Sequence, residues 1–517
     1  MSGTVATNPP RRWGCLPILA GMSYSELIQR SREANLLASC ASLLSWDEST
    51  YMPRQGGEHR GEQMALLARL GHEMATHPRI GELLDALRAE EPNLDVLQAA
   101  NVREIRRGYE RAVRVPVALV EELARVTTTA QGVWREAKQR GDFATFRPHL
   151  ERIVILLRDK ADAIGHTGNR YDALLDEYEP GATAAQVTQL FTDLQAELVP
   201  LIQAIAASGR VPDTSLLRRE FPIERQRLFS EAAAAAVGFD FDAGRLDVSV
   251  HPFCCTIGPG DCRITTRYTE RHFNESFFGV LHETGHGLYE QNLPREHFGT
   301  PAGSAASLGI HESQSRLWEN QVGRSRPFWE HFFPRAVQTF PSLRGVKLDA
   351  WMAAINEVRP SFIRVEADET TYNLHIILRF QLEQALLSGD LAVADLPAAW
   401  DDAFEAMLGM RPSNAAEGCL QDVHWSFGGL GYFPTYTLGN LYAAQFMAAA
   451  RREMPGLDDD FRRGEFGRLR DWLRANIHGP GGVYRASHLC ARVTGEGLDP
   501  RPLLAYLRDK AATYYGV

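Results

Sequence analysis

The stretch from Phe277 to Tyr289 reads FFGVLHETGHGLY, and it constrains both the fold and the chemistry of this chain. Its apolar residues recur at helical spacing, so we predict a helix here. His282 and His286 are four residues apart, which places both imidazoles on one helix face within reach of one metal ion. Gly285 and Gly287 lower helix propensity, which indicates that another element approaches this helix closely.

Glu283 lies between the two histidines, roughly 100° around the helix from His282. We expect it to lie near the metal without being a ligand. A carboxylate in this place can take a proton from a metal-bound water, an arrangement typical of zinc peptidases. The alternative is an ordinary helix that carries two polar histidines, and the apolar neighbours favour the metal helix.

A catalytic zinc site has three protein ligands and keeps the fourth position for water. Residues 307–315 (SLGIHESQS) open a second predicted helix, and two of them are candidates for the third ligand. Glu312 lies 26 residues after His286, which leaves room for a loop and a helix that packs back on the first. His311 is adjacent and chemically suitable, so the spacing leaves both candidates open.

Helical periodicity dominates the rest of the chain, with one exception between residues 245 and 268. Residues 245–250 alternate polar and apolar side chains, residues 258–261 (GPGD) form a turn signal, and residues 263–268 resume a β-rich pattern. The sequence therefore predicts a mainly α fold, a single large helical body with a small β-sheet beside the metal helix.

Composition excludes several classes of partner. Hydrophobic content of 44% and charged content of 23% are typical of a soluble globular protein. A net charge of −10 without a long basic run argues against nucleic acid. We found no apolar stretch long enough to predict a membrane span. The seven cysteines form no CxxC pair, which favours reduced thiols in a cytoplasmic compartment. Residues 1–21 are predicted to be a disordered extension.

Six short motifs occur in a fixed order along the chain: HPF (251–253), DCRIT (261–265), HETGH (282–286), HESQ (311–314), IRVEAD (363–368) and GCLQDVHW (418–425). In these motifs the chain resembles the M32 metallocarboxypeptidases, the thermostable (Taq-type) carboxypeptidase family. The resemblance continues in WDESTYMP (46–53), YDALLDEYEPG (171–181) and TGE (494–496). It implies that residues 22–517 form one catalytic domain.

The resemblance implies that Glu312 of HESQ is the third metal ligand, with His282 and His286 as the other two. It implies one Zn²⁺ per chain, which Co²⁺ or another divalent ion could replace. It also implies a deep substrate groove, peptide substrates with a free C-terminus, and a homodimer. These remain expectations from the family.

Amide hydrolysis needs further groups around the metal. A donor must meet the developing oxyanion, and His424 of the QDVHW motif is the first candidate, followed by Tyr432 and Tyr436. An arginine must bind the terminal carboxylate, and Arg364 and Arg263 both lie in matched motifs. We favour Arg364, because Asp261 offers Arg263 a structural partner. His251 is expected to shape the substrate cleft, with a buried core histidine as the alternative.

The sequence departs from the family pattern at two places, and two alternative functions remain open. Cys254, Cys255 and Cys262 stand where the family pattern leads us to expect small or aliphatic residues, which makes the side-chain preference less certain. The first alternative is a zinc oligopeptidase or endopeptidase with the same ligands and no carboxylate clamp. The second is a non-catalytic metal-binding protein, and Glu283 argues against it because metal binding alone needs no carboxylate there.

Overall fold

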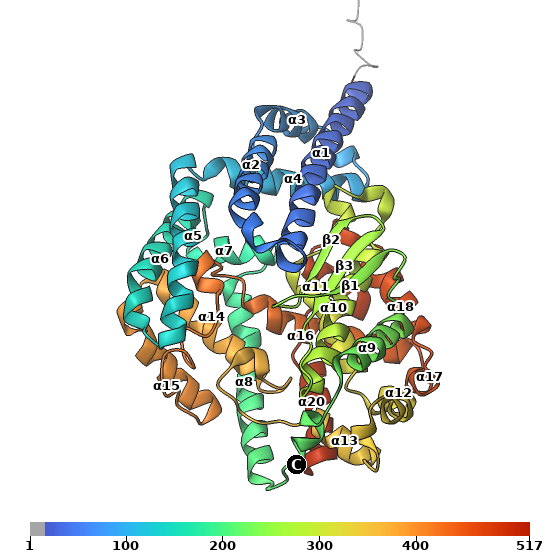
Figure 1. Cartoon of the computed structure of the whole chain (residues 1–517). Helices are drawn as coiled ribbons and strands as arrows, with labels where there is room; N and C mark the ends of the chain where they lie inside the picture. Colours follow the sequence, from blue (N-terminus) through green and yellow to red (C-terminus); the bar gives the residue numbers. More distant parts are fainter. Residues whose placement is uncertain (1–15) are drawn as a thin grey trace, which may run out of the picture.

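The first half of the chain is a series of helices (Figure 1). The computed structural model describes the chain from Leu16 onward. The first helix therefore includes residues 16–21, which we had assigned to the extension; a proline at position 17 falls in its first turn, where the helix needs no N–H. Residues 1–15 lie outside the described part. The helices that precede the sheet are α1 (Leu16–Thr50), α2 (Gly57–Ala75), α3 (Pro78–Arg88), α4 (Val96–Arg114), α5 (Val117–Arg140), α6 (Phe143–Ile164), α7 (Arg170–Tyr178), α8 (Ala184–Ala207) and α9 (Ile223–Val237).

A three-stranded sheet follows, with strand order β1-β3-β2. Strands β2 (Cys254–Gly258) and β3 (Asp261–Thr266) form an antiparallel hairpin, and Gly260 in its turn has φ +87°. That positive φ suits glycine, which has no Cβ. Strand β1 (Gly244–Val248) pairs in parallel with β3, a pairing that the local pattern did not predict. The turn and β3 were predicted, whereas β2 was not, because the alternating stretch at residues 245–250 corresponds to β1.

Helix α10 (Phe273–Asn292) carries the HETGH motif and packs on this sheet. Val280 of α10 and Ile264 of β3 are fully buried and share an apolar cluster with Phe239. On the opposite side, the thiol of Cys255 in β2 contacts the backbone carbonyl oxygen of Ser42 in α1. The small sheet therefore lies between the metal helix and α1, as Figure 1 shows.

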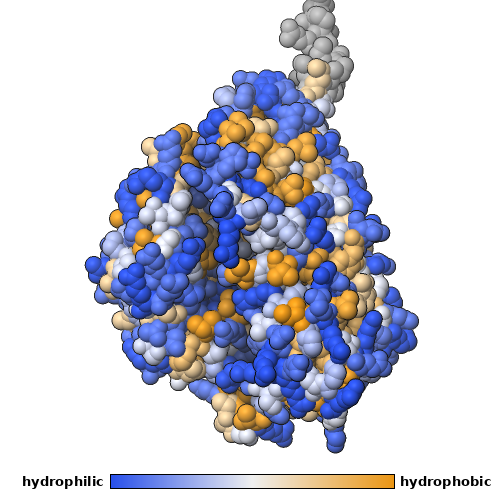
Figure 2. Space-filling model, viewed as in Figure 1, coloured by the Kyte–Doolittle hydropathy of each residue, from blue (hydrophilic) through white to orange (hydrophobic). Residues whose placement is uncertain are grey.

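The rest of the chain is helical again, and the mainly α prediction is confirmed. One large apolar core joins both halves, and Figure 2 shows the molecule hollowed between the side that carries α5 and α6 and the side that carries the sheet. The helices after α10 are α11 (Leu308–Arg316), α12 (Arg326–Thr339), α13 (Leu348–Ile355), α14 (Tyr372–Ser388), α15 (Leu396–Leu408), α16 (Pro434–Glu453), α17 (Leu457–Arg463), α18 (Gly467–Leu473), α19 (Ala486–Thr494) and α20 (Arg501–Tyr515).

One described helix, α8, is long and apolar enough to cross a membrane by length and composition alone. The sequence analysis had predicted no such stretch. In the fold, Val187, Phe191, Leu194 and Leu198 of this helix are buried at helical spacing and belong to the large core. That pattern is typical of an amphipathic core helix.

Candidate active site

Three predicted metal ligands come together between α10 and α11. The Nε2 atoms of His282 and His286 lie 3.7 and 3.4 Å from Oε2 of Glu312. All three ligand atoms are within 4.8 Å of one another. Ligands at 2.0–2.2 Å from a tetrahedral ion are separated by about 3.4 Å, so the donor set fits a zinc-sized ion.

Gly285 and Gly287 allow neighbouring segments of the chain to approach α10 closely. A Cβ built at Gly285 would lie 2.4 Å from the carbonyl oxygen of Gln314 in α11, and one at Gly287 would lie 2.6 Å from Cε2 of Phe239. The close approach predicted for these two positions is confirmed. On the other side of α11, a Cβ at Gly439 of α16 would lie 2.5 Å from Cγ of Glu312. Helix α11 is therefore enclosed, and Glu312 is held against the two histidines.

Hydrogen bonds to the Nδ1 atoms orient the imidazoles of His282 and His286. Nδ1 of His282 lies 2.9 Å from Oε2 of Glu319, and Nδ1 of His286 lies 2.6 Å from Nδ1 of His311. His311 Nε2 lies 2.8 Å from Oε1 of Glu290, so both nitrogens of His311 are engaged and it is not one of the three clustered ligands. An imidazole that binds a metal through Nε2 carries its proton on Nδ1, which matches this chain of contacts.

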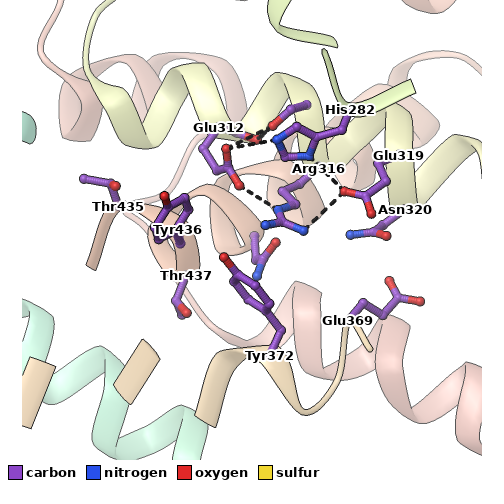
Figure 3. A network of polar contacts seen from close by, with 12 residues as sticks. His282, Glu312, Arg316, Glu319, Asn320, Glu369, Tyr372, Thr435, Tyr436 and Thr437 are labelled. Carbon is purple, nitrogen blue, oxygen red and sulfur yellow. Dashed lines mark hydrogen bonds and ion pairs between the residues drawn. The ribbon is translucent and has the colours of Figure 1, made fainter. Parts of the chain in front are cut away.

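Arg316 links the ligand Glu312 to Glu319, the residue that contacts His282 (Figure 3). Its Nε donates to Oε1 of Glu312 at 2.7 Å, and its Nη1 donates to Oε2 of Glu319 at 3.2 Å. Burial alone would raise the pKa of Glu312, but Arg316 and His282 outweigh it and hold that pKa well below its usual range. The sequence analysis missed Arg316 and Glu319. Their spacing of four and seven residues after Glu312 on one helical stretch was the available signal.

Glu283 is buried, with 6% of its surface exposed, and it is not in the ligand cluster. Burial raises the pKa of its carboxyl to about 7. A carboxyl with such a pKa can accept and release a proton near neutral pH.

The three predicted oxyanion donors lie together at the start of α16. Nε2 of His424, in the short helical turn His424–Phe427, lies 3.2 Å from the hydroxyl of Tyr436. The rings of Tyr432 and Tyr436 are 5.4 Å apart. Burial lowers the pKa of His424 to about 3, so its imidazole is neutral. Gly439, three residues after Tyr436 in α16, packs against Glu312, and Figure 3 shows Tyr436 beside this ligand.

Arg364 lies in a buried ion network beside these tyrosines. Its Nε and Nη2 donate to Oδ1 of Asp422 at 3.0 and 2.7 Å, and its Nη1 donates to the hydroxyl of Tyr372 at 2.7 Å. Arg379 donates to the other carboxylate oxygen of Asp422 at 2.7 Å. The guanidinium of Arg316 lies 4.5 Å from the Tyr372 ring, so a single aromatic ring separates Arg364 from the arginine that holds Glu312.

The other substrate-binding candidates lie around the sheet. Arg263 pairs with both oxygens of Asp261 at 2.8 and 2.7 Å, as the structural alternative expected, and stacks on Trp46 at 4.1 Å. His251 is exposed, so the alternative of a buried core histidine is wrong. The thiols of Cys254 and Cys262 are 3.6 Å apart, and the cysteines in the described residues are free.

Comparison with known proteins shows the family of this chain. The model of the carboxypeptidase Taq (M32) metallopeptidase family matches residues 26–511. The chain belongs to the M32 family. It is 50% identical over 505 residues to thermostable carboxypeptidase 1 of Thermus thermophilus, across 96% of this chain and 99% of that protein.

Solved structures of M32 proteins have the same fold. The M32 carboxypeptidase from Deinococcus radiodurans superimposes with a TM-score of 0.92 at 42% identity, covering 96% of this chain and 100% of that one. Trypanosoma cruzi metallocarboxypeptidase 1 gives 0.91 at 36% identity, covering 95% and 99%. The predicted M32 metallocarboxypeptidase function is thus confirmed: this M32 protein is a metal-dependent hydrolase of peptides.

Proposed function

We propose that this M32 enzyme is a zinc-dependent carboxypeptidase in which His282, His286 and Glu312 hold the ion. The observation that carries this proposal is the spacing of the three ligand atoms beside a buried carboxylate, Glu283, that is not part of the cluster. A bound zinc ion supplies a water of lowered pKa and polarises the scissile carbonyl. Co²⁺ or another divalent ion would suit the same donors.

Glu283 acts as the general base. Its carboxylate takes a proton from the attacking water and then delivers it to the leaving amine. The burial that raises its pKa to about 7 matches that task, because the group must both gain and lose a proton in one turnover.

Tyr436 donates to the developing oxyanion, and His424 orients it. The reason for this order is that Nε2 of His424 already contacts the Tyr436 hydroxyl, while the Tyr436 side chain is half-buried beside the ligand Glu312. Tyr432 is the second phenol available to the substrate. A hydrogen-bond donor held in place before the reaction stabilises negative charge without reorganisation.

Arg364 binds the terminal carboxylate of the peptide. A guanidinium has five N–H donors, and Arg364 spends three of them on Asp422 and Tyr372, which fix its plane and leave two for a ligand. Arg263 is the second choice because Asp261 already occupies it bidentately. His251 is proposed to line the outer part of the cleft.

The remainder of the peptide would lie in the hollow that Figure 2 shows. A cavity of about 450 Å³ is lined by Tyr178, Ser307 and Leu308, among others. The ring centroids of Tyr178 and Tyr432 are 5.1 Å apart, so this cavity adjoins the proposed oxyanion donors.

We further propose a cytoplasmic homodimer without a nucleic-acid or membrane partner. The free cysteines and the net charge of −10 support the compartment and the absence of nucleic acid. Leu36 and Leu43 of α1 and Leu66 of α2 are exposed apolar side chains that a second copy could cover. Sedimentation equilibrium tests the dimer, and a single species at the mass of one chain would contradict it.

One digestion separates a carboxypeptidase from an endopeptidase with the same ligands. The metal-loaded enzyme is given one peptide with a free C-terminus and the same peptide with an amidated C-terminus, and products are followed by mass spectrometry. The proposal predicts stepwise loss of single C-terminal residues from the free peptide only, abolished by a chelator and restored by Zn²⁺. Internal cleavage of both peptides would contradict it.

A further inference from the structure

Glu383 of α14 is a fully buried carboxylate that the mechanism above does not use. Three donors from three parts of the chain converge on it. The Tyr171 hydroxyl of α7 donates to Oε2 at 2.7 Å, and the backbone N–H of Gly431 donates to the same oxygen at 3.1 Å. The indole N–H of Trp425 donates to Oε1 at 2.8 Å.

Two of these donors are direct chain neighbours of the proposed oxyanion donors. Trp425 follows His424, and Gly431 precedes Tyr432. Glu383 therefore fixes both ends of the segment 424–431, from which Tyr432 and Tyr436 continue into α16. Gly431 has φ +94°, and a Cβ there would lie 2.8 Å from the backbone carbonyl carbon of Leu174. The segment lies directly against α7 at this point.

The contacts require a carboxylate in particular. The N–H groups of Trp425 and Gly431 can only donate, and they point to different oxygens of Glu383. A carboxylate accepts both, whereas an amide offers one oxygen and must turn its NH₂ group towards the other donor. A buried donor without an acceptor is unfavourable, so an isosteric amide would release one end of the segment.

We propose that Glu383 is a positioning residue for the M32 reaction, holding the segment 424–436 so that Tyr436, oriented by His424, meets the oxyanion. This inference rests on the proposed function, since it assigns Glu383 an effect through those two side chains. Burial raises the pKa of Glu383 to about 7, and the three hydrogen-bond donors counter this rise, with a smaller effect from Arg379.

The test compares Glu383→Gln with Tyr171→Phe in the metal-loaded enzyme. Tyr171→Phe removes one donor to the same buried carboxylate but leaves the contacts to Trp425 and Gly431. We expect Glu383→Gln to lower kcat by about 10- to 100-fold, since small misplacements of catalytic groups have effects of this size, with KM and metal content little changed. Tyr171→Phe should keep kcat within about threefold of wild type. Tyr436→Phe should cost less in the Glu383→Gln background than alone, because a residue that acts through another is not additive with it.

Amide hydrogen exchange across residues 424–436 provides a readout that does not depend on activity, and it should be faster in Glu383→Gln. Unchanged exchange would overturn the anchoring. Faster exchange with wild-type kcat, or equal kcat losses in Glu383→Gln and Tyr171→Phe, would overturn the positioning role. An inactive wild-type enzyme, by contrast, would reject the proposed function itself. If Glu383→Gln does not fold, Trp425→Phe decides the matter, because it removes the indole N–H and keeps a ring: lower kcat supports the proposal, and unchanged kcat overturns it.

Discussion

Arg364 and Arg263 each donate two hydrogen bonds to an aspartate, but their surroundings differ. Arg364 is 6% exposed and lies beside Tyr372 and Tyr436, whereas Arg263 stacks on Trp46 of α1. Asp422 keeps Arg379 as a partner when Arg364 is removed, so an Arg364 variant leaves no unpaired buried carboxylate. That makes the carboxylate clamp testable without loss of the fold.

Arg364→Ala should mainly penalise substrates with a free carboxylate. The loss of one partner of a buried, charge-assisted pair costs about 2–5 kcal/mol, or about 30-fold to several-thousand-fold in kcat/KM. Lys at this position should rescue only partly, because it keeps the charge but loses the fork. Amidated peptides, already poor substrates, should change little.

Arg263→Ala is the matched control for this prediction, because it removes an arginine with the same kind of partner. It should lower the melting temperature and affect free and amidated peptides alike. Equal losses on both peptides for Arg364→Ala, with a lower melting temperature, would assign Arg364 a structural role.

At the scale of elements, the approach of α10 to α11 determines whether the three ligands meet. Gly285→Ala would place a methyl group 2.4 Å from the backbone carbonyl oxygen of Gln314, which cannot move without shifting Glu312. We expect a loss of stability of about 1–3 kcal/mol from overpacking. We also expect weaker metal binding, measured by competition with a chelator.

Gly279→Ala, on the same helix, is the control. A Cβ there meets only Oγ1 of Thr266, at 3.7 Å, which is ordinary contact. Because alanine has the higher helix propensity, this variant should be neutral or more stable by up to about 1 kcal/mol. Similar chelator sensitivity in both variants would show that the helix approach does not control the ligand set.

The elements that the sequence predicted are those whose signals are local. The HETGH helix follows from apolar spacing, and strands β1 and β3 follow from the β-like stretches on either side of the turn at residues 258–261. Strand β2 was not predicted. The parallel pairing of β1 with β3 was not predicted, because it depends on how the connection between the strands folds. The start of α1 at Leu16 was also missed, because the scattered proline and glycine of that segment were taken as signs of disorder.

In the site, too, local signals could be predicted and contacts between distant segments could not. His282, His286 and Glu312 carry a motif, so their clustering could be predicted from spacing and resemblance. The contact between His311 and Glu290 joins two helices, and its geometry depends on the register with which they pack. No local pattern specifies that register, which is why the residues that orient the imidazoles were found only in the structure.

At the scale of the whole molecule, buried carboxylates connect distant segments. Glu179, at the end of α7, accepts from the backbone N–H of Gly309 at 3.0 Å and from the Tyr442 hydroxyl at 3.4 Å. It thereby joins α7, the start of α11 and the middle of α16. Burial raises the pKa of Glu179 to about 7, whereas an unfolded chain titrates near the ordinary value of 4.5.

This difference predicts a pH-dependent stability. Because the folded pKa is raised, the contribution of Glu179 is fully present below about pH 4.5 and is lost as pH rises through about 7. Glu179→Gln lacks this titration. The melting temperature of wild type relative to Glu179→Gln should therefore fall between pH 5 and pH 8, by an amount equivalent to at most about 3 kcal/mol. A difference that stays constant over this range would contradict a buried, neutral Glu179.

In the proposed mechanism, Glu283 of the HETGH helix acts as the base while His282, His286 and Glu312 hold the metal. The most direct measurement is the metal content and kcat of Glu283→Gln, prepared beside wild type. Glu283 is not in the ligand cluster, so the variant should bind one equivalent of metal, while kcat falls by several orders of magnitude because the base is gone. Near-normal turnover by a metal-replete Glu283→Gln enzyme would contradict the role of Glu283 as general base.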